Sequence, residues 1–199
     1  MMKHNRVLAG LAACGMVLAP VLVLAQEVSI TRSVLQDLPY TLIYPAVLQA
    51  TGGGVDPVTL NHPQAPLQCD MHVVPVEDTS WTVDGALAEL DDAEVASAWA
   101  DTLPGFAVAS KGTVQYQDAA ALTYEGTSTD SAMGMPLTLV HTETVASGRG
   151  YVLDCLFAAD QAEQARPLVD FIVTNFSTRA DAECCIGVTV VEPEPPAAQ

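Results

Sequence analysis

The sequence predicts an α+β fold, in which an antiparallel β-sheet is flanked by two main α-helices. Three patterns support this prediction: apolar–polar alternation over residues 67–73, a glycine-containing connection at 146–150, and helical apolar stripes within 91–102 and 160–176. A short hairpin connection implies antiparallel strands, because parallel strands need a long crossover. Amphipathic helices must bury their apolar stripes, so we expect both helices to pack on the sheet.

The early part of the chain predicts two strands. Residues 38–47, which contain Pro39 and Pro45, predict an opening strand that ends in a loop. Residues 51–57 are rich in glycine and predict a plain loop, because they lack the lysine and the following helix of a phosphate-binding loop. The second strand, 67–73, should be half-buried. Its apolar face carries Leu67, Cys69, Met71 and Val73.

A helix is predicted to follow these strands. Asp91 and Glu94 form a capping-box pattern, which is typical of a helix start. Apolar residues then recur at helical spacing until Pro104 and Gly105, which predict the helix end. Residues 84–90 predict an extra turn or two before it.

The second half predicts a set of strands and a closing helix. The expected strands cover residues 114–116, 121–125, 137–144 and 151–157, with a last short strand at 186–191. Asp160 and Glu163 offer another capping box ahead of the second apolar stripe. Pro167 is unfavourable inside a helix, so we expect the regular helix to start near it.

The layout resembles the PsbP-like superfamily. The resemblance covers about residues 38–176, and it depends on Tyr44-Pro45, the segment 103–106, and the closing runs 148–153 and 172–176. It implies an α/β/α sandwich, with the antiparallel sheet between helices. It also implies a non-enzymatic role, in which the protein binds or stabilises partners. No functional residue is transferred, because no binding motif matches position by position.

The N-terminus predicts export. Lys3 and Arg6 give a basic start, residues 7–24 are apolar and uncharged, and Ala25 ends a cleavage-like sequence. We therefore expect residues 1–25 to be a signal peptide and the protein to be periplasmic or secreted, with no membrane span after cleavage. Retention of the apolar run as a transmembrane anchor is the alternative, and Pro20 argues against it.

A lipid anchor is a second alternative. Leu11-Ala12-Ala13-Cys14 matches the box that precedes a lipid-modified cysteine in bacterial lipoproteins. The apolar stretch before Cys14 is very short, and residues 16–24 would remain as an apolar mature N-terminus. Both facts favour cleavage after Ala25 instead.

The remaining chain is strongly acidic. Lys3 and Arg6 would leave with the signal, so five basic residues would face 24 acidic ones, and the net charge would change from −17 to −19. Such a chain is repelled by nucleic acid and by anionic lipid, which excludes a nucleic-acid partner. Residues 26–191 are sufficient for a single domain. Residues 192–199 are acidic and proline-rich, and they predict a disordered tail.

Four cysteines stay in the mature chain: Cys69, Cys155, Cys184 and Cys185. An even number in an exported chain predicts disulfides. Cys69 and Cys155 fall on the apolar faces of their strands, which favours a core bond between them. Cys184 and Cys185 could bond to either of these, dimerise the protein or hold a soft metal; we favour a bond that ties the tail to the domain.

Candidate metal ligands are few. Met133 and Met135 with His141, and His72 beside Asp70, resemble parts of a copper site, because thioethers and imidazoles suit copper. No catalytic motif and no cofactor motif is present in the sequence. The sequence therefore predicts an exported non-enzymatic binding or accessory protein, with another envelope protein as its partner. A copper-binding protein and an enzyme of unknown reaction are the alternatives.

Overall fold

The computed structural model describes residues 32–35, 37–53, 56–77 and 80–182. Several predicted features lie outside these residues: the signal peptide at 1–25 with Cys14 and Ala25, the vicinal Cys184 and Cys185, the strand at 186–191 and the tail at 192–199. Within the described part, no helix has the length and hydrophobicity needed to cross a bilayer.

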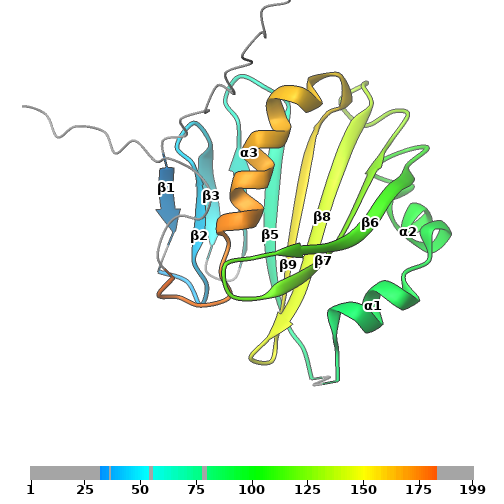
Figure 1. The fold of residues 1–199 in the computed structure, drawn as a ribbon. Coiled ribbons are helices and arrows are strands. Elements are labelled where there is room, and N and C mark those ends of the chain that lie inside the picture. The colour runs from blue at the N-terminus through cyan, green and yellow to red at the C-terminus, as the bar shows by residue number, and fades with distance from the viewer. Residues whose placement is uncertain (1–31, 36, 54–55, 78–79, 183–199) are drawn as a thin grey trace, which may run out of the picture.

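The described residues form nine strands and three α-helices, joined by short turns (Figure 1). In chain order these are β1 (Arg32–Leu35), β2 (Leu42–Pro45), β3 (Gln49–Gly53), β4 (Asp56–Asn61), β5 (Leu67–Pro75), α1 (Val83–Glu89), α2 (Asp92–Trp99), β6 (Ala107–Gln115), β7 (Ala120–Thr127), β8 (Leu137–Ala146), β9 (Arg149–Ala158), the 3₁₀ turn η1 (Ala159–Gln161) and α3 (Ala162–Asn175). The predicted α+β class is confirmed.

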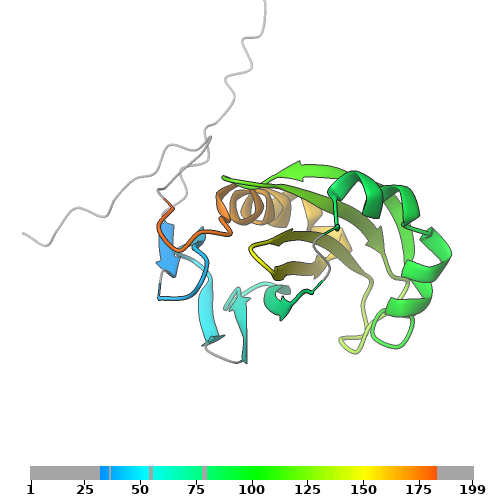
Figure 2. The same cartoon turned by 90° about the horizontal axis from the view of Figure 1, so that it is seen from below.

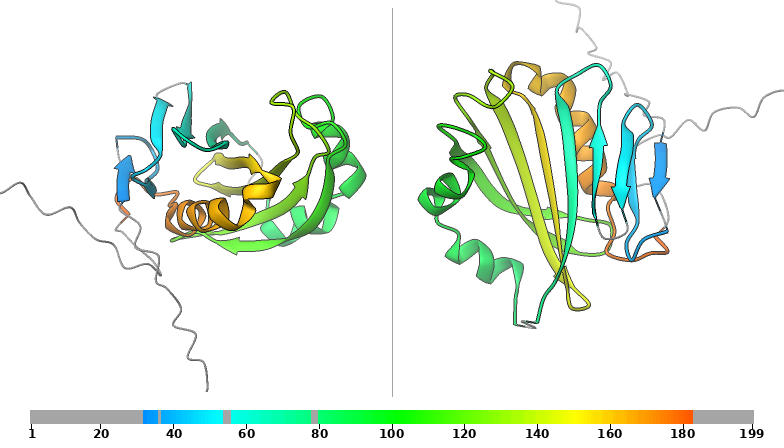
Figure 3. Two further views of the ribbon diagram at one scale, coloured as in Figure 1. Left: turned by 90° about the horizontal axis from the view of Figure 1, so that it is seen from above. Right: turned by 180° about the vertical axis from the view of Figure 1, so that it is seen from behind.

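The strands form two antiparallel sheets. β1 and β2 pair in a small sheet, and the other seven follow the order β3-β4-β5-β9-β8-β7-β6. Figures 2 and 3 show α3 on the inner side of the curved large sheet, and α1 and α2 on its outer side near β6 and β7. The large sheet therefore lies between two helical layers.

Each helical layer covers its own core. The larger core lies under α3 and β2, and its fully buried members include Leu42, Leu60, Phe157, Val169 and Ile172. The smaller core lies under α1 and α2 and includes Leu103, Leu122 and Leu139. Alternation along β7 places neighbouring residues in different cores, as expected for a sheet buried on both faces.

The strongest sequence patterns are confirmed. In β5, Leu67, Cys69 and Met71 are buried, and the residues between them are more exposed. The predicted hairpin is a two-residue turn between β8 and β9, in which Ser147 has φ 51° and Gly148 has φ 73°. Positive φ at both central residues is the geometry that a tight, right-twisted hairpin requires.

The helix start at Asp91 is also confirmed. Its carboxylate accepts hydrogen bonds from the backbone N–H of Ala93, at 2.9 Å, and of Glu94, at 3.0 Å. A short separate helix, α1, precedes it, with Thr82 as its N-cap. Asp91 thus starts a new helix instead of continuing the first one.

The expected start of the closing helix is wrong. Asp160 and Glu163 form no cap, because residues 159–161 turn as a 3₁₀ helix and α3 begins after Gln161 without a side-chain cap. Pro167 lies inside α3. It removes the hydrogen bond to the carbonyl of Glu163, which lies on an exposed part of the helix where water can replace it.

The N-terminal strands differ from the prediction as well. The opening strand is restricted to β2. Of residues 51–57, predicted as a plain loop, 51–53 belong to β3 and 56–57 belong to β4. Gly52 has φ 83°, and a Cβ atom there would meet the carbonyl oxygen of Pro57. Glycine is thus needed here to let two strands approach closely at a bulge. The strand at 114–116 is the end of the longer β6.

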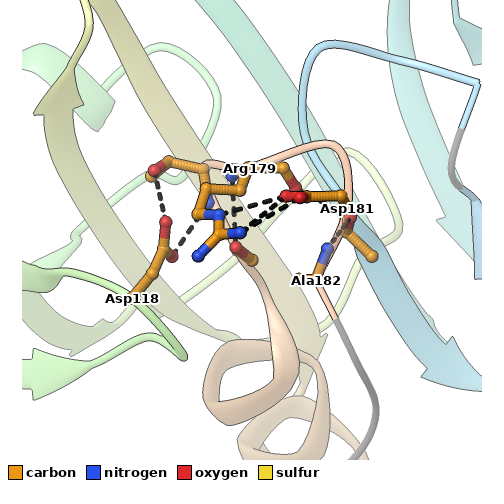
Figure 4. Close-up of polar contacts among 7 residues, drawn as sticks. Asp118, Arg179, Asp181 and Ala182 are labelled. Carbon is orange, nitrogen blue, oxygen red and sulfur yellow. Dashed lines mark hydrogen bonds and ion pairs between the residues drawn. The ribbon is translucent and has the colours of Figure 1, made fainter.

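A C-terminal strap, residues 177–182, fastens the chain after α3 (Figure 4). Ser177 and Thr41 of the β1–β2 region exchange two backbone hydrogen bonds of 3.0 Å. Asp118, in the β6–β7 turn, accepts hydrogen bonds from the Thr178 N–H at 3.0 Å and hydroxyl at 2.6 Å. The Ala182 N–H donates to the Thr41 hydroxyl at 3.3 Å. The strap therefore ties the end of α3 to Thr41 beside β2 and to the β6–β7 turn.

Truncation of Ile172 tests the larger core. Ile172 is 0% exposed on the inner face of α3. We expect Ile172→Ala to lower the free energy of unfolding by about 2–5 kcal/mol, through lost burial and a residual cavity. Val47→Ala, at a side chain that is 45% exposed, should change it by less than about 0.5 kcal/mol. Urea denaturation monitored by circular dichroism measures both, and equal losses would contradict the assigned core.

Candidate functional site

The buried cysteines meet at the centre of the large sheet. Cys69 of β5 lies directly opposite Cys155 of β9, with their Cα atoms 4.0 Å apart, and a disulfide joins them. Both residues are fully buried. Because this bond uses both cysteines, neither is left for Cys184 or Cys185. A bond from the tail to either core cysteine, the use we favoured, is therefore not compatible with this pairing.

His141 belongs to a polar row that crosses the large sheet. The row consists of six residues that face one another on neighbouring strands: Thr59, Asp70, Asp154, His141, Tyr124 and Lys111. Asp70 accepts a hydrogen bond from the Thr59 hydroxyl at 2.6 Å. The sequence did not reveal the row, because its members come from six strands whose register only the fold defines.

Both ring nitrogens of His141 face carboxylates. Nδ1 lies 2.7 Å from Asp154 Oδ1, and Nε2 lies 3.6 Å from Glu143 Oε2. The ring also stacks on Tyr124 at 4.3 Å, and the Tyr124 hydroxyl accepts a hydrogen bond of 2.9 Å from Trp99 of α2. This arrangement connects α2 to the centre of the sheet.

The surroundings of His141 favour its charged form. Burial lowers its pKa, but the hydrogen bonds to Asp154 and Glu143, and the charges of these carboxylates, outweigh burial and raise the pKa to about 9. His141 is therefore protonated at neutral pH, with Nδ1 donating to Asp154 and Nε2 facing the Glu143 carboxylate. A metal ion could bind here only by displacing a proton and a carboxylate.

The fold does not gather the other candidate copper ligands around His141. His72 lies on β5, and β9 separates it from β8, which carries His141. Met133 is 58% exposed in the loop before β8, and Met135 packs against the smaller core. Within the described ranges, no three His, Cys, Asp or Glu side chains are placed to hold a metal ion together.

His72 instead lines a pocket of about 540 Å³, which we call the β5 slot. Four segments form it: residues 71–75 of β5, the loop 38–40, residues 56–57 at the start of β4, and residues 147–149 of the β8–β9 turn. Successive side chains of a strand point to opposite faces. A pocket lined by five consecutive residues of one strand therefore lies along the edge of that strand.

The slot exists because β5 pairs unequally with its two neighbours. Its pairing with β9 extends to Pro75 opposite Arg149, but its pairing with β4 ends at Met71 opposite Val58. Asp56 and Pro57, at the start of β4, have no partner in the described β4–β5 register, and Asp56 pairs with Gly53 of β3. Residues 72–75 therefore pair with β9 along one side, whereas their other side has no partner in the described β4–β5 register.

The direction of the β5 backbone groups follows from the ladder. Val76 donates to Gly148, at 3.0 Å, and Ala158 donates to Pro66, at 3.1 Å, so the even-numbered residues of β5 bond to β9. The backbone N–H and C=O groups of the odd-numbered β5 residues point the other way, toward the β4 side. The N–H and C=O of Val73 therefore face the slot, and neither has a β4 partner in the described register.

Two charged side chains of opposite sign line the slot. Asp56 is exposed at one wall and Arg149 at another. Among the described residues Arg149 forms no ion pair, whereas the three cations Lys111, Arg166 and Arg179 each bind a carboxylate. Leu38, Tyr40 and Val73 add apolar surface to the slot, beside the polar side chains of His72 and Ser147. Such a slot suits an extended segment that carries both apolar side chains and an acidic group.

Solved structures identify the architecture. Cyanobacterial PsbP (CyanoP) from Synechocystis is 15% identical with a TM-score of 0.50, and the alignment covers 83% of this chain and 97% of that chain. The Ran-binding protein Mog1p of Saccharomyces cerevisiae is 11% identical with a TM-score of 0.51, over 74% of this chain and 95% of that chain. The fold is PsbP-like.

The PsbP-like fold confirms the resemblance seen in the sequence. No protein-family model and no curated protein sequence matches the chain. At such low identities the likeness shows the fold alone, so the slot and the polar row must be interpreted from this chain's own residues. The slot was missed in the sequence because no strand was predicted over residues 58–61, and an open edge requires knowledge of both neighbouring strands.

Loss of the disulfide should weaken the domain. Cys69 and Cys155 are 86 residues apart in sequence. Replacing both by Ala should lower the free energy of unfolding by about 2–5 kcal/mol, as for other small disulfide-bonded domains. Replacing Cys184 and Cys185 by Ala is the control and should leave it nearly unchanged. Urea denaturation without reductant makes the comparison; equal losses in both double variants would contradict the assigned pairing.

The charge of His141 should make stability depend on pH. Its pKa in the folded chain, about 9, exceeds the ordinary value of 6.5, so its protonation stabilises the folded state. This contribution is complete below pH 6.5 and disappears as the pH rises through 9. It amounts to on the order of 2–3 kcal/mol.

Urea denaturation at pH 6 and pH 9.5 measures this contribution. From pH 6 to pH 9.5 the free energy of unfolding should fall more in the parent chain than in His141→Gln, by on the order of 2–3 kcal/mol. The same pH dependence in both chains would show that His141 does not carry the charge.

Proposed function

We propose that the chain is an exported, non-enzymatic accessory protein of the cell envelope, which binds another envelope protein through the β5 slot. The partner contributes an extended segment that adds to the sheet beside residues 72–75. The observation that supports this most directly is the open backbone of Val73 inside a pocket of about 540 Å³. In strand addition, main-chain hydrogen bonds supply affinity and side-chain pockets supply specificity.

The exposure of this edge is itself informative. Natural proteins usually protect open strand edges with charges, prolines or covering loops, because such edges attract other chains. In β5 a proline, Pro75, stands only at the end of the open stretch, and Val73 and Val74 remain apolar. Val74 is 46% exposed. The loop 38–40 and residues 56–57 flank this edge but leave a pocket beside it, and such a space is expected where pairing with another chain is useful.

Export and an accessory role agree with several further features. The basic start and uncharged run of residues 1–25 have the build of a signal peptide. The Cys69–Cys155 disulfide suits an oxidising compartment. Mog1p, which shares the fold, is described as a Ran-binding protein, so a PsbP-like scaffold can support protein binding.

Site-specific photo-crosslinking in the native envelope tests the proposal. A photoreactive benzoyl-phenylalanine at Val74, in the slot, should produce a discrete adduct with one other envelope protein. The matched control is the same residue at Val47, which is equally exposed, at 45% against 46%, but lies outside the slot. At Val47 no such adduct should form.

A backbone variant shows whether the adduct depends on strand pairing. Val73→Pro removes an N–H that points away from β9, so the β5–β9 ladder loses no hydrogen bond, and prolines are tolerated at such edge positions. The Val74 adduct should fall at least tenfold in this background. Equal adducts at positions 74 and 47, or an adduct that survives Val73→Pro, would overturn the proposed function.

A further inference from the structure

We infer that a segment of this chain itself, residues 186–191, occupies the β5 slot as an added strand when no partner is bound. The inference rests on the proposed strand-accepting function of the slot and adds its regulation: a partner has to displace the chain's own C-terminal segment. Four observations carry it, namely the place where the described chain ends, the reach of the residues that follow, their sequence, and the charge of the slot.

The described chain ends beside the slot. The C-terminal strap holds Ala182 against Thr41 through the hydrogen bond to the Thr41 hydroxyl (Figure 4). Thr41 directly follows Tyr40, which lines the slot. In Figure 1 the strap lies at the lower end of the fold, which is also the end where β5 finishes and the β8–β9 turn lies. β1, in contrast, enters at the upper end.

The following residues can reach the slot. Only residues 183–185 separate Ala182 from Ile186, and an extended chain spans at most about 13 Å over those four steps. That reach permits entry beside Tyr40, but it is too short for a wide search of the surface. After Ala182 the chain continues for 17 residues, to Gln199, which is enough for a strand and a free tail.

The sequence of the segment suits an added strand. Residues 186–191 contain neither charge nor proline, and four of the six are Ile or Val. Strand alternation would place Ile186, Val188 and Val190 on one side, where they could face apolar side chains of the slot such as Leu38 and Val73. Pro193 and the prolines after it then prevent further pairing. The six-residue segment is therefore long enough to cover the open edge, residues 72–75.

The charges are complementary. Glu192 directly follows the segment, and Glu194 is close behind it. Arg149 lines the slot and forms no ion pair with any residue that the structure describes. Occupation of the slot by residues 186–191 would bring an acidic group of the tail to Arg149.

Amide hydrogen exchange in the full chain, followed by NMR, tests the inference, with two neighbouring residues as reporter and control. The Val73 N–H faces the slot, so it should be protected only when a strand occupies the slot. The Val74 N–H bonds to β9, so it should be protected in either case and should report that the domain is folded.

A proline in the middle of the segment should release it. Thr189→Pro removes one N–H and restricts the backbone of the added strand. We expect the Val73 amide to exchange at least tenfold faster in this variant than in the parent chain, with Val74 unchanged. Ala198→Pro, placed beyond the segment in the proline-rich tail, is the matched control and should leave both amides unchanged.

Three results would overturn the inference. The Val73 amide could exchange freely in the parent chain, or it could be protected equally in Thr189→Pro. Its protection could also increase with protein concentration, in which case the segment would come from a second copy. All three results concern the occupant alone. The proposed function is tested separately by the Val74 adduct, so the failure of one proposal is distinguishable from the failure of the other.

Discussion

The pairing of β5 with β9 is the interaction on which the rest of the structure depends. These strands are paired along the whole of β5, from Leu67 opposite Phe157 to Pro75 opposite Arg149, and the disulfide fixes their register at the pair Cys69–Cys155. A shift by one residue would move every buried side chain to the wrong face. The disulfide, the larger core and the polar row therefore all require the same register.

The slot exists because β5 pairs with β9 along its whole length but with β4 along only part of it. β4 pairs with β5 only as far as Val58, which is also the residue opposite Gly52 where the register of the β3–β4 pairing shifts. The fold thus has an open strand edge next to a rigid, covalently fixed strand. A rigid edge is suited to binding, because little conformational entropy is lost when a segment pairs with it.

The sequence was sufficient where the pattern was local. Alternation identified β5, Asp91 identified the start of α2, and the glycine-containing connection identified the β8–β9 turn. It failed where the physical cause is long-range. Gly52 suggested a loop, although its lack of a side chain is what lets β3 approach β4. Pro167 suggested a helix start, although tertiary packing holds α3 on both sides of it.

The candidate sites show the same division between local and long-range information. The core location of Cys69 and Cys155 was readable from strand alternation alone, since both lie on apolar faces. The environment of His141 was not readable, because Asp154 and Tyr124 lie on other strands. The slot was the least predictable feature, because it depends on where the pairing of β4 with β5 stops.

The end of the β4–β5 ladder is the central claim, and proton NMR tests it most directly. In an antiparallel ladder, residues that face each other without mutual hydrogen bonds bring their Hα atoms into close contact. Thr59 and Asp70 are such a pair in the structure, and Pro57 and His72 would be the next one if the ladder continued. We expect a strong Hα–Hα Overhauser contact between Thr59 and Asp70, and none between Pro57 and His72. A contact of equal strength at both pairs would mean that β4 covers β5 to its end, and that the slot is closed.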